Sequence, residues 1–247
     1  MTDRRQPPTL FVTATDTEVG KTAVASALAA LLRRRGRDVG VIKPFASGCS
    51  EVDGRLVSAD GLCLARAAGS DDAHELVCPV RLRHPLAPLA AAELEGVEID
   101  LDAARGALAE VAARHDCLIV EGIGGVLVPI TTETTVADFA AELAAPVLVV
   151  ARAGLGTINH SLLTVGALRA RGLEVAAVVL NAAEPSAGGP AEETNPGVIA
   201  RTGGVGVIGP VPYCEGVSVE TGELAGLPDA LAAVEGVDEL IARWLES

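Results

Sequence analysis

Short aliphatic runs alternate along the chain with longer segments whose apolar residues recur at helical spacing. The runs predict six strands, at residues 10–13, 39–44, 117–121, 147–151, 175–181 and 205–210. The segments at helical spacing predict helices at residues 21–35, 59–68, 101–114, 136–143, 159–171, 190–202 and 237–245. Strands separated mostly by helices favour an α/β fold, in which a parallel sheet is covered on both faces and its crossovers are right-handed.

One segment interrupts this alternation. Residues 184–193 are rich in Pro, Gly, Ala and Ser, which predicts a flexible loop that is either a lid or slack chain. No change of composition marks a linker elsewhere. All 247 residues are therefore expected to form a single domain, with residues 1–8 as a loose N-terminal tail.

Composition agrees with a buried parallel sheet. Apolar residues make up 49% of the chain and aromatic residues only 2%, so the core must rest on many aliphatic contacts. Charged or strongly polar residues interrupt every apolar stretch before it could cross a membrane. The first ten residues lack a small-residue cleavage site, so no secretory signal is expected. These features favour a cytoplasmic protein.

Charge and cysteine content exclude several classes of partner. A net charge of −14 argues against nucleic acid and anionic membranes as partners. The five cysteines contain no CxxC pair and are expected to be reduced thiols, and the four histidines have no spacing typical of a transition-metal site. A polyanionic ligand would need a locally positive pocket, which a few lysines, helix N-termini and a bound divalent cation could form.

The segment TATDTEVGKTA, residues 13–23, has the context of a phosphate-binding loop, because it follows an apolar run and opens a helical pattern. Gly20 would let the backbone approach a phosphate, Lys21 supplies a positive charge, and Thr22 offers a hydroxyl to a magnesium ion. The fit to GxxxxGK[ST] is imperfect, since Thr15 occupies the first glycine position and Ala14 precedes it. Either the loop is one residue longer than usual or the match is accidental.

Further polar residues follow the other predicted strands at the same edge of the sheet. Lys43 closes the second strand, Asp60 lies at the start of the next helix, and Glu121 closes the third strand. Singly, they could be a solvated loop charge, a first-turn acidic residue and an ordinary strand end. Because ligands of open parallel sheets bind beyond the carboxyl ends of the strands, their joint occurrence with Lys21 and Thr22 predicts a magnesium–nucleotide site.

These motifs resemble one known family, the dethiobiotin synthetases, which have a fold of the P-loop NTPase type. The resemblance is carried by TDTEVGKT at 15–22, KPFASG at 43–48, VEGIGG at 120–125, LGTINHSLLT at 155–164 and LN at 180–181. The family has a longer loop, with five residues between its two glycine positions, which accounts for the imperfect motif. The implied reaction is ATP-dependent carboxylation and ring closure of 7,8-diaminononanoate with CO2, by way of a carbamate and a carbamic-phosphoric anhydride, with release of ADP and phosphate.

The resemblance also implies roles for individual residues. Lys21 and Lys43 would be catalytic, and Mg2+ would be held by Thr22, Asp60 and Glu121. The diamine would contact Thr17 and Ser47, while its carboxylate would lie at Gly156, Thr157 and Asn159 of a second subunit, which implies a homodimer. Asn181 would meet the adenine edge, the 210–212 segment would line the base, and Glu215 would lie near the ribose. The full ATP-binding set would be Glu18, Val19, Gly20, Lys21, Thr22, Ala23, Asp60, Glu121, Gly122, Ile123, Gly124, Asn181, Ala182, Pro210, Val211, Pro212 and Glu215.

The chain departs from the family pattern at two positions. Ala14 stands where the family usually has glycine, which would cost roughly 1–2 kcal/mol if that position needs positive φ. Ile123 replaces a commonly small residue and would narrow the pocket beside the phosphates.

Two alternatives share a related nucleotide domain. A ligase like the cobyrinate synthases would need a glutaminase domain, for which the chain leaves no room. A deviant P-loop ATPase switch would need an additional lysine at the start of its loop, where this chain has residues 14–16 without one.

Overall fold

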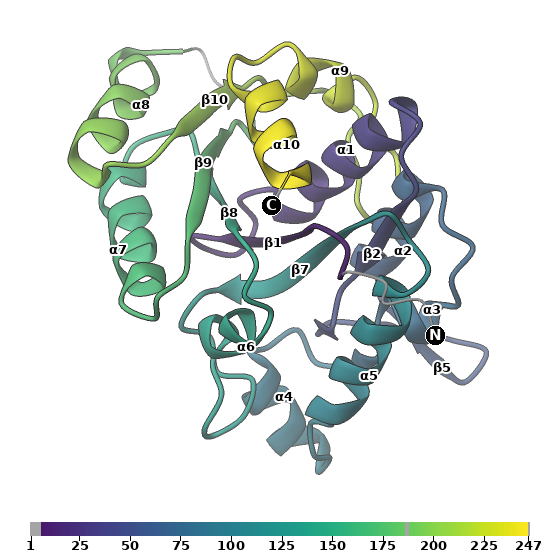
Figure 1. The fold of residues 1–247 in the computed structure, drawn as a ribbon. Coiled ribbons are helices and arrows are strands. Elements are labelled where there is room, and N and C mark those ends of the chain that lie inside the picture. Colours follow the sequence, from purple (N-terminus) through teal and green to yellow (C-terminus); the bar gives the residue numbers. More distant parts are fainter. Residues whose placement is uncertain (1–5, 186–187, 247) are drawn as a thin grey trace.

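Six parallel strands form the central sheet of the computed structural model, which describes residues 6–185 and 188–246. The order across the sheet is β10-β9-β8-β1-β7-β2, and every neighbouring pair is parallel (Figure 1). Each run predicted from the sequence is a strand, which confirms the α/β fold class. The strands are β1 Thr9–Ala14, β2 Val39–Ile42, β7 Cys117–Gly125, β8 Val147–Arg152, β9 Val175–Asn181 and β10 Val207–Val211.

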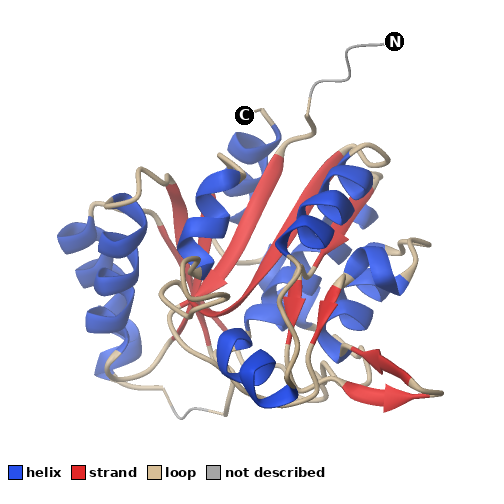
Figure 2. Cartoon of the chain, turned by 90° about the horizontal axis from the view of Figure 1, so that it is seen from below, coloured by secondary structure: helices blue, strands red, loops and turns tan. Residues whose placement is uncertain are grey.

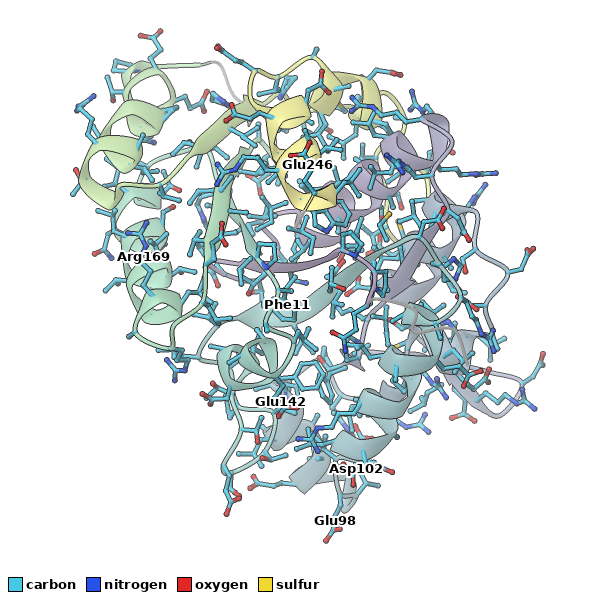
Figure 3. The ribbon with its side chains drawn as sticks, viewed as in Figure 1. Phe11, Glu98, Asp102, Glu142, Arg169 and Glu246 are labelled. Carbon is cyan, nitrogen blue, oxygen red and sulfur yellow. The ribbon has the colours of Figure 1, made fainter. Side chains whose placement is uncertain are left out.

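Alternate residues of each strand face two different layers of helices. In β1, Leu10 and Val12 pack in one core cluster and Phe11, labelled in Figure 3, packs in the other, because successive side chains of a strand point to opposite faces. Figure 1 shows α1 and α10 on one side of the sheet and α6 and α7 on the other. No helix in the described part of the chain has the length and apolar character to cross a bilayer. The first layer contains α1 Lys21–Arg34, α2 Ala59–Ala68, α9 Leu227–Ala232 and α10 Val237–Leu245, and the second contains α5 Leu101–Ala112, α6 Val136–Glu142, α7 Thr157–Arg169 and α8 Pro190–Gly203.

Short elements connect the main strands and are absent from the sequence prediction. Two of them form a hairpin that projects from the body of the protein (Figure 2). Strands of two or three residues show no measurable period, and α3 has only one turn, so hydrophobic patterning does not reveal them. They are β3 Phe45–Ala46 paired with β6 Val80–Arg81, the hairpin β4 Ser50–Val52 and β5 Arg55–Val57, and the helices α3 His74–Val77 and α4 Pro88–Glu95; α9 was also not predicted.

Several predicted boundaries differ from the structure. The third strand, predicted at 117–121, continues to Gly125, so Glu121 lies within β7 and does not close it. Strand β2 ends at Ile42, because the N–H of Lys43 donates to the carbonyl of Val77 and leaves the main sheet. Helix α8 begins at Pro190, whose fixed φ suits a first helical position, so the loop expected at 184–193 is shorter; residues 186–187 lie outside the described residues. Residues 1–5 of the expected tail also lie outside them, and the carbonyl of Pro8 already accepts from the N–H of Leu118.

His115 links three segments of the chain at the edge of the sheet where the strands begin, and it is far from the P-loop in sequence. His115 lies with Nδ1 2.7 Å from an oxygen of Asp38 and Nε2 2.8 Å from an oxygen of Asp72. Burial disfavours the imidazolium, but hydrogen bonds and charge from the two carboxylates outweigh it and raise the pKa of His115. The bridge therefore stabilises the protein most when His115 is protonated.

We expect His115→Gln to lower the free energy of unfolding by about 1 kcal/mol at pH 6 and by less at pH 9. A raised folded-state pKa gives stabilisation that is fully present below the unfolded pKa and is lost as pH rises through the folded value. Urea unfolding of both proteins at the two pH values measures the difference. An equal loss at both pH values would show that protonation of the bridge contributes nothing.

Candidate active site

A cleft of about 850 Å³ opens at the carboxyl edge of β1, β2 and β7. Residues from the P-loop, from the segment after β2, from α2 and from the end of β7 line it. Those predicted from the sequence are Thr17, Glu18, Gly20, Lys21, Thr22, Ala23, Lys43, Ser47, Asp60, Ile123 and Gly124. Those that the sequence did not indicate are Asp16, Gly48, Pro85, Leu86, Ala87, Val128, Val219 and Glu220.

The P-loop is held from behind by Asn181, the last residue of β9. The Asn181 amide Nδ2 donates to the carbonyl of Val19 at 3.0 Å. Gly20 precedes α1 with φ of 86°, and a Cβ there would lie 2.2 Å from Nδ2 of Asn181. Glycine is thus required at position 20 both by the left-handed backbone and by the close approach of the asparagine. The N–H groups at the start of α1 consequently face the cleft as an anion site.

Ala14 has no unfavourable backbone conformation. It is the last residue of β1, pairs with Val150 of β8, and its side chain is buried in the core on the α1 side. The extended region suits alanine, so the cost expected for positive φ does not arise.

The carboxylate of Glu121 is the centre of the cleft's polar network. Its Oε1 accepts hydrogen bonds from Lys21 Nζ at 2.7 Å, from Thr22 Oγ1 at 2.7 Å and from Lys43 Nζ at 2.5 Å. The Lys43 ammonium also lies 2.7 Å from Oδ2 of Asp60 and donates to the carbonyl of Gly122 at 3.1 Å. With its side chain only 2% exposed, Lys43 is a buried member of this network and not a solvated loop charge.

The two lysines experience different surroundings. Burial, together with repulsion from Lys43, lowers the pKa of Lys21 to about 8, although Glu121 opposes the change. Burial opposes the charge on Lys43 as well, but Glu121 and Asp60 together outweigh it and raise the pKa of Lys43 above its usual range. Burial disfavours the Asp60 carboxylate, yet Lys43 and Lys21 lower its pKa to about 2. At neutral pH the site therefore holds an ionised Asp60 and two largely protonated amines.

These two lysines are the only lysines of the chain, since the other 17 of its 19 basic residues are arginines. We expect an amine-directed acylating reagent at pH 8 to modify Lys21, whose pKa is about 8 and whose side chain is 10% exposed. Lys43, which is protonated and buried, should react at least ~10-fold more slowly. Peptide mass spectrometry with and without ATP measures both sites, and ATP should protect Lys21. Faster reaction of Lys43 would contradict this assignment of charge.

A second pocket, of about 530 Å³, adjoins the cleft on the far side of the P-loop. Both are lined by Glu18, Gly20, Ala23, Val219 and Glu220, so the two pockets share walls made by the P-loop and by the 219–220 segment. Of the residues expected around the base, Asn181, Ala182 and Pro212 line this pocket. Lining residues without a recognisable sequence motif include Tyr213, Cys214, Val217, Ser218 and Leu227.

Three other residues expected near the base or sugar line neither pocket. Val211 is buried in β10, where its carbonyl accepts from the N–H of Ala182 at 3.0 Å. Pro210 and Glu215 are exposed outside the lining.

The start of α7 lies outside the cleft of the same chain. Thr157 is fully buried, with Oγ1 3.4 Å from Oγ of Ser161, whereas Gly156 and Asn159 are exposed. The neighbouring Leu155 is 89% exposed, an unusual position for a large aliphatic side chain. None of these residues lines the cleft of their own chain.

The oxygen atoms around Lys43 fit a hard divalent cation better than a transition metal. Among residues 6–185 and 188–246, no group of three or more His, Cys, Asp or Glu is arranged to hold a metal ion. Asp60, Glu121 and the Thr22 hydroxyl do converge, and Oε2 of Glu121 is buried with no hydrogen-bond partner in the described part of the chain. Mg2+ usually takes one or two carboxylates and completes its shell with phosphate and water, so this donor set is suitable.

Sequence comparison relates the chain to curated enzymes over most of its length. A family described as an AAA domain matches residues 8–221. The chain is 38% identical over 210 residues to the ATP-dependent dethiobiotin synthetase of Thermodesulfovibrio yellowstonii, covering 82% of this chain and 88% of that protein. It is 50% identical over 192 residues to that of Anaeromyxobacter dehalogenans, covering 78% and 84%.

Structural comparison finds the same fold in distant ATPases. The MinD cell division protein of Aquifex aeolicus aligns with a TM-score of 0.54 and 15% identity, covering 97% of each chain. At this identity the likeness concerns the fold alone, so it does not favour a switch ATPase over an enzyme. The identity of 38–50% to the curated synthetases separates these possibilities.

Proposed function

The chain belongs to the family of ATP-dependent dethiobiotin synthetases, and we propose that the cleft around Lys21, Lys43 and Glu121 is where ATP drives its reaction. The activity is that of an ATP-dependent ligase in biotin biosynthesis. The main support for this location is the convergence of both lysines of the chain on one buried carboxylate beside a P-loop.

We infer the following chemistry for 7,8-diaminononanoate, CO2 and ATP. One amine of the diamine adds to CO2 and loses a proton, forming a carbamate. A carbamate oxygen then attacks the γ-phosphorus and displaces ADP, which gives a carbamic-phosphoric anhydride. The second amine attacks the carbamoyl carbon, phosphate leaves, and the ureido ring of dethiobiotin closes. Two anions must approach each other in the phosphoryl transfer, so fixed positive charge at that point lowers the barrier.

The nucleotide is assigned to the cleft and the second pocket together. The phosphates would lie against the N–H groups of residues 18–23, where the left-handed Gly20 opens α1. The base would enter the pocket lined by Asn181, Ala182 and Pro212, with the sugar beneath Val219 and Glu220. Glu220, which lines both pockets, is therefore proposed as a contact near the sugar, whereas Glu215 does not line either pocket.

We propose that Thr22, Asp60 and Glu121 hold Mg2+ when ATP is bound, on the strength of their convergence and the unpartnered Oε2 of Glu121. The ion would supply positive charge to the phosphate oxygens. The chain itself contributes Lys43, which stays protonated between Asp60 and Glu121, and Lys21, which can turn from Glu121 to a phosphate oxygen. Thr17 and Ser47 line the same cleft and are assigned to the diamine or its carbamate.

A second copy of the chain is proposed to complete the diamine site. The support is that Gly156 and Asn159 are exposed and do not line the cleft of their own chain, and that the exposed Leu155 and Leu163 belong to the same segment. The start of α7 in one copy would bind the substrate carboxylate in the other, since helix N-termini attract anions. A Leu155→Asp/Leu163→Asp variant should sediment as a monomer and raise KM for the diamine while still binding ADP. A monomeric wild-type protein with full activity would rule out this arrangement.

The reaction itself is tested with purified protein, Mg-ATP, bicarbonate and 7,8-diaminononanoate. Release of ADP is followed together with the mass of the ureido product, and the control omits the diamine. We expect ADP release to require the diamine and to equal product formation. ATP turnover that proceeds equally without the diamine would refute the proposed reaction.

A further inference from the structure

We propose that His74 is a positioning residue for Asp60: its ring accepts the hydrogen bond that fixes the first turn of the helix carrying that carboxylate. The inference rests on the proposed function only in taking Asp60 as a ligand of the nucleotide's metal ion. His74 belongs to α3, which packs beside α2 (Figure 1). It touches neither the cleft nor the second pocket, so it is not expected to contact substrate.

The contact is made through Ser58, the N-cap of α2. Oγ of Ser58 accepts from the N–H of Gly61 at 3.2 Å, which is ordinary N-capping. The backbone N–H of Ser58 donates to Nε2 of His74 at 3.0 Å. Ser58 is only 3% exposed, so water cannot readily replace that acceptor, and a buried N–H without one is costly.

The local sequence explains why a residue from another helix supplies this acceptor. In a capping box, the side chain at the third helical position accepts the N–H of the N-cap, as Asp138 does for Thr135 at the start of α6. In α2 the third position is Gly61, which has no side chain to do so. A Cβ at position 61 would lie 3.2 Å from Cε1 of His74 and 3.2 Å from Cβ of Cys78, so the missing side chain makes room for the ring.

The neutral ring is required for this role. Nε2 can accept only when it carries no proton, so the proton of neutral His74 is on Nδ1, which is buried and has no hydrogen-bond partner in the described part of the chain. Burial and the nearby charge of Arg81 lower the pKa of His74, although Glu75 opposes the change, and this favours the accepting form. Asp60 lies two residues after Ser58 and 2.7 Å from Nζ of Lys43. A shift of the first turn of α2 would therefore move the Asp60 carboxylate directly relative to Lys43 and Thr22.

Two substitutions at position 74 distinguish the effect of losing the hydrogen-bond acceptor from the effect of changing the side-chain volume. His74→Gln can place an amide oxygen near the position of Nε2, whereas His74→Leu keeps the bulk and removes the acceptor. The readout is the affinity for ADP measured by calorimetry with and without Mg2+, and the ratio of the two affinities is the gain due to the metal. We expect this ratio to fall about 10-fold or more in His74→Leu and to stay close to wild type in His74→Gln.

Two controls make the result specific. His115→Gln weakens a distant histidine bridge and should leave the metal-dependent ratio unchanged. Asp60→Asn should itself reduce the ratio; if it does not, the proposed metal ligand is wrong. The positioning role is refuted if Asp60→Asn reduces the metal-dependent ratio while His74→Leu does not. It is also refuted if His74→Gln reduces the ratio as much as His74→Leu does. Neither outcome affects the proposed function.

Discussion

Replacing Lys43 by alanine is expected to reduce the rate of ring closure by at least ~10³-fold while the protein still binds ADP. The Lys43 ammonium forms ion pairs with two carboxylates of the site, Glu121 at 2.5 Å and Asp60 at 2.7 Å, which keep it protonated. The proposed transfer brings a carbamate toward the triphosphate, and without Lys43 only Lys21 remains as a lysine to offset that charge. Single-turnover formation of dethiobiotin measures the effect on chemistry separately from nucleotide affinity.

The same substitution should also cost stability, because it leaves two carboxylates near each other with less positive charge between them. We expect the free energy of unfolding to fall by about 3 kcal/mol, within the range for breaking a buried ion pair. Circular dichroism must therefore confirm that the variant is folded at the assay temperature. A folded Lys43→Ala protein with wild-type turnover would remove Lys43 from the mechanism.

Glu121→Gln is expected to have a comparably large effect by removing the shared partner of both lysines. The amide keeps the shape of the side chain but loses the charge that Lys21, Thr22 and Lys43 all address. We expect kcat/KM for ATP to fall at least ~10²-fold and stability to fall by about 3 kcal/mol. Loss of the carboxylate should also lower the pKa of Lys21 further, so its acylation at pH 7 should become faster than in the wild type.

An exposed carboxylate provides the matched control for this substitution. Glu142 pairs with Arg105 at 2.8 Å on the surface, where ion pairs contribute little. Glu142→Gln should change neither kcat/KM nor Lys21 acylation. If Glu121→Gln behaves like Glu142→Gln, the network centred on Glu121 has no role in the reaction.

The sequence alone determined much of this protein. The hydrophobic pattern located all six strands of the main sheet, because a strand that is buried on both faces has a continuous run of aliphatic residues. The P-loop was recognisable from Gly20, Lys21 and Thr22 in their strand–loop–helix context. Lys43 and Glu121 were indicated by their places at the ends of predicted strands, and Asp60 by its place at the start of a helix. These signals are local, so they need no knowledge of how the strands are ordered.

Some residues of the site have no local signal. The lining of the second pocket comes from an irregular segment at 213–220, and nothing in its sequence marks its contact with the P-loop. The sequence left open whether alanine at position 14 destabilises the protein, because that depends on the sign of its φ angle. The pairing of β1 with β8 shows that the backbone at Ala14 is extended. His74 shows no motif, because its partner is a backbone N–H sixteen residues earlier in the chain.

The order of the strands was decided by the tertiary structure alone. Along the chain, the strand that carries Glu121 comes after those that precede Lys21 and Lys43, but in the sheet β7 lies between β1 and β2. That order brings a carboxylate 100 residues from Lys21 and 78 residues from Lys43 between the two amines. The sequence determined that Lys21, Lys43 and Glu121 are near strand ends. The order of the strands made the buried Glu121 carboxylate the common partner of both lysines. Pairing of strands that are so far apart in sequence depends on packing of the whole core and not on local pattern.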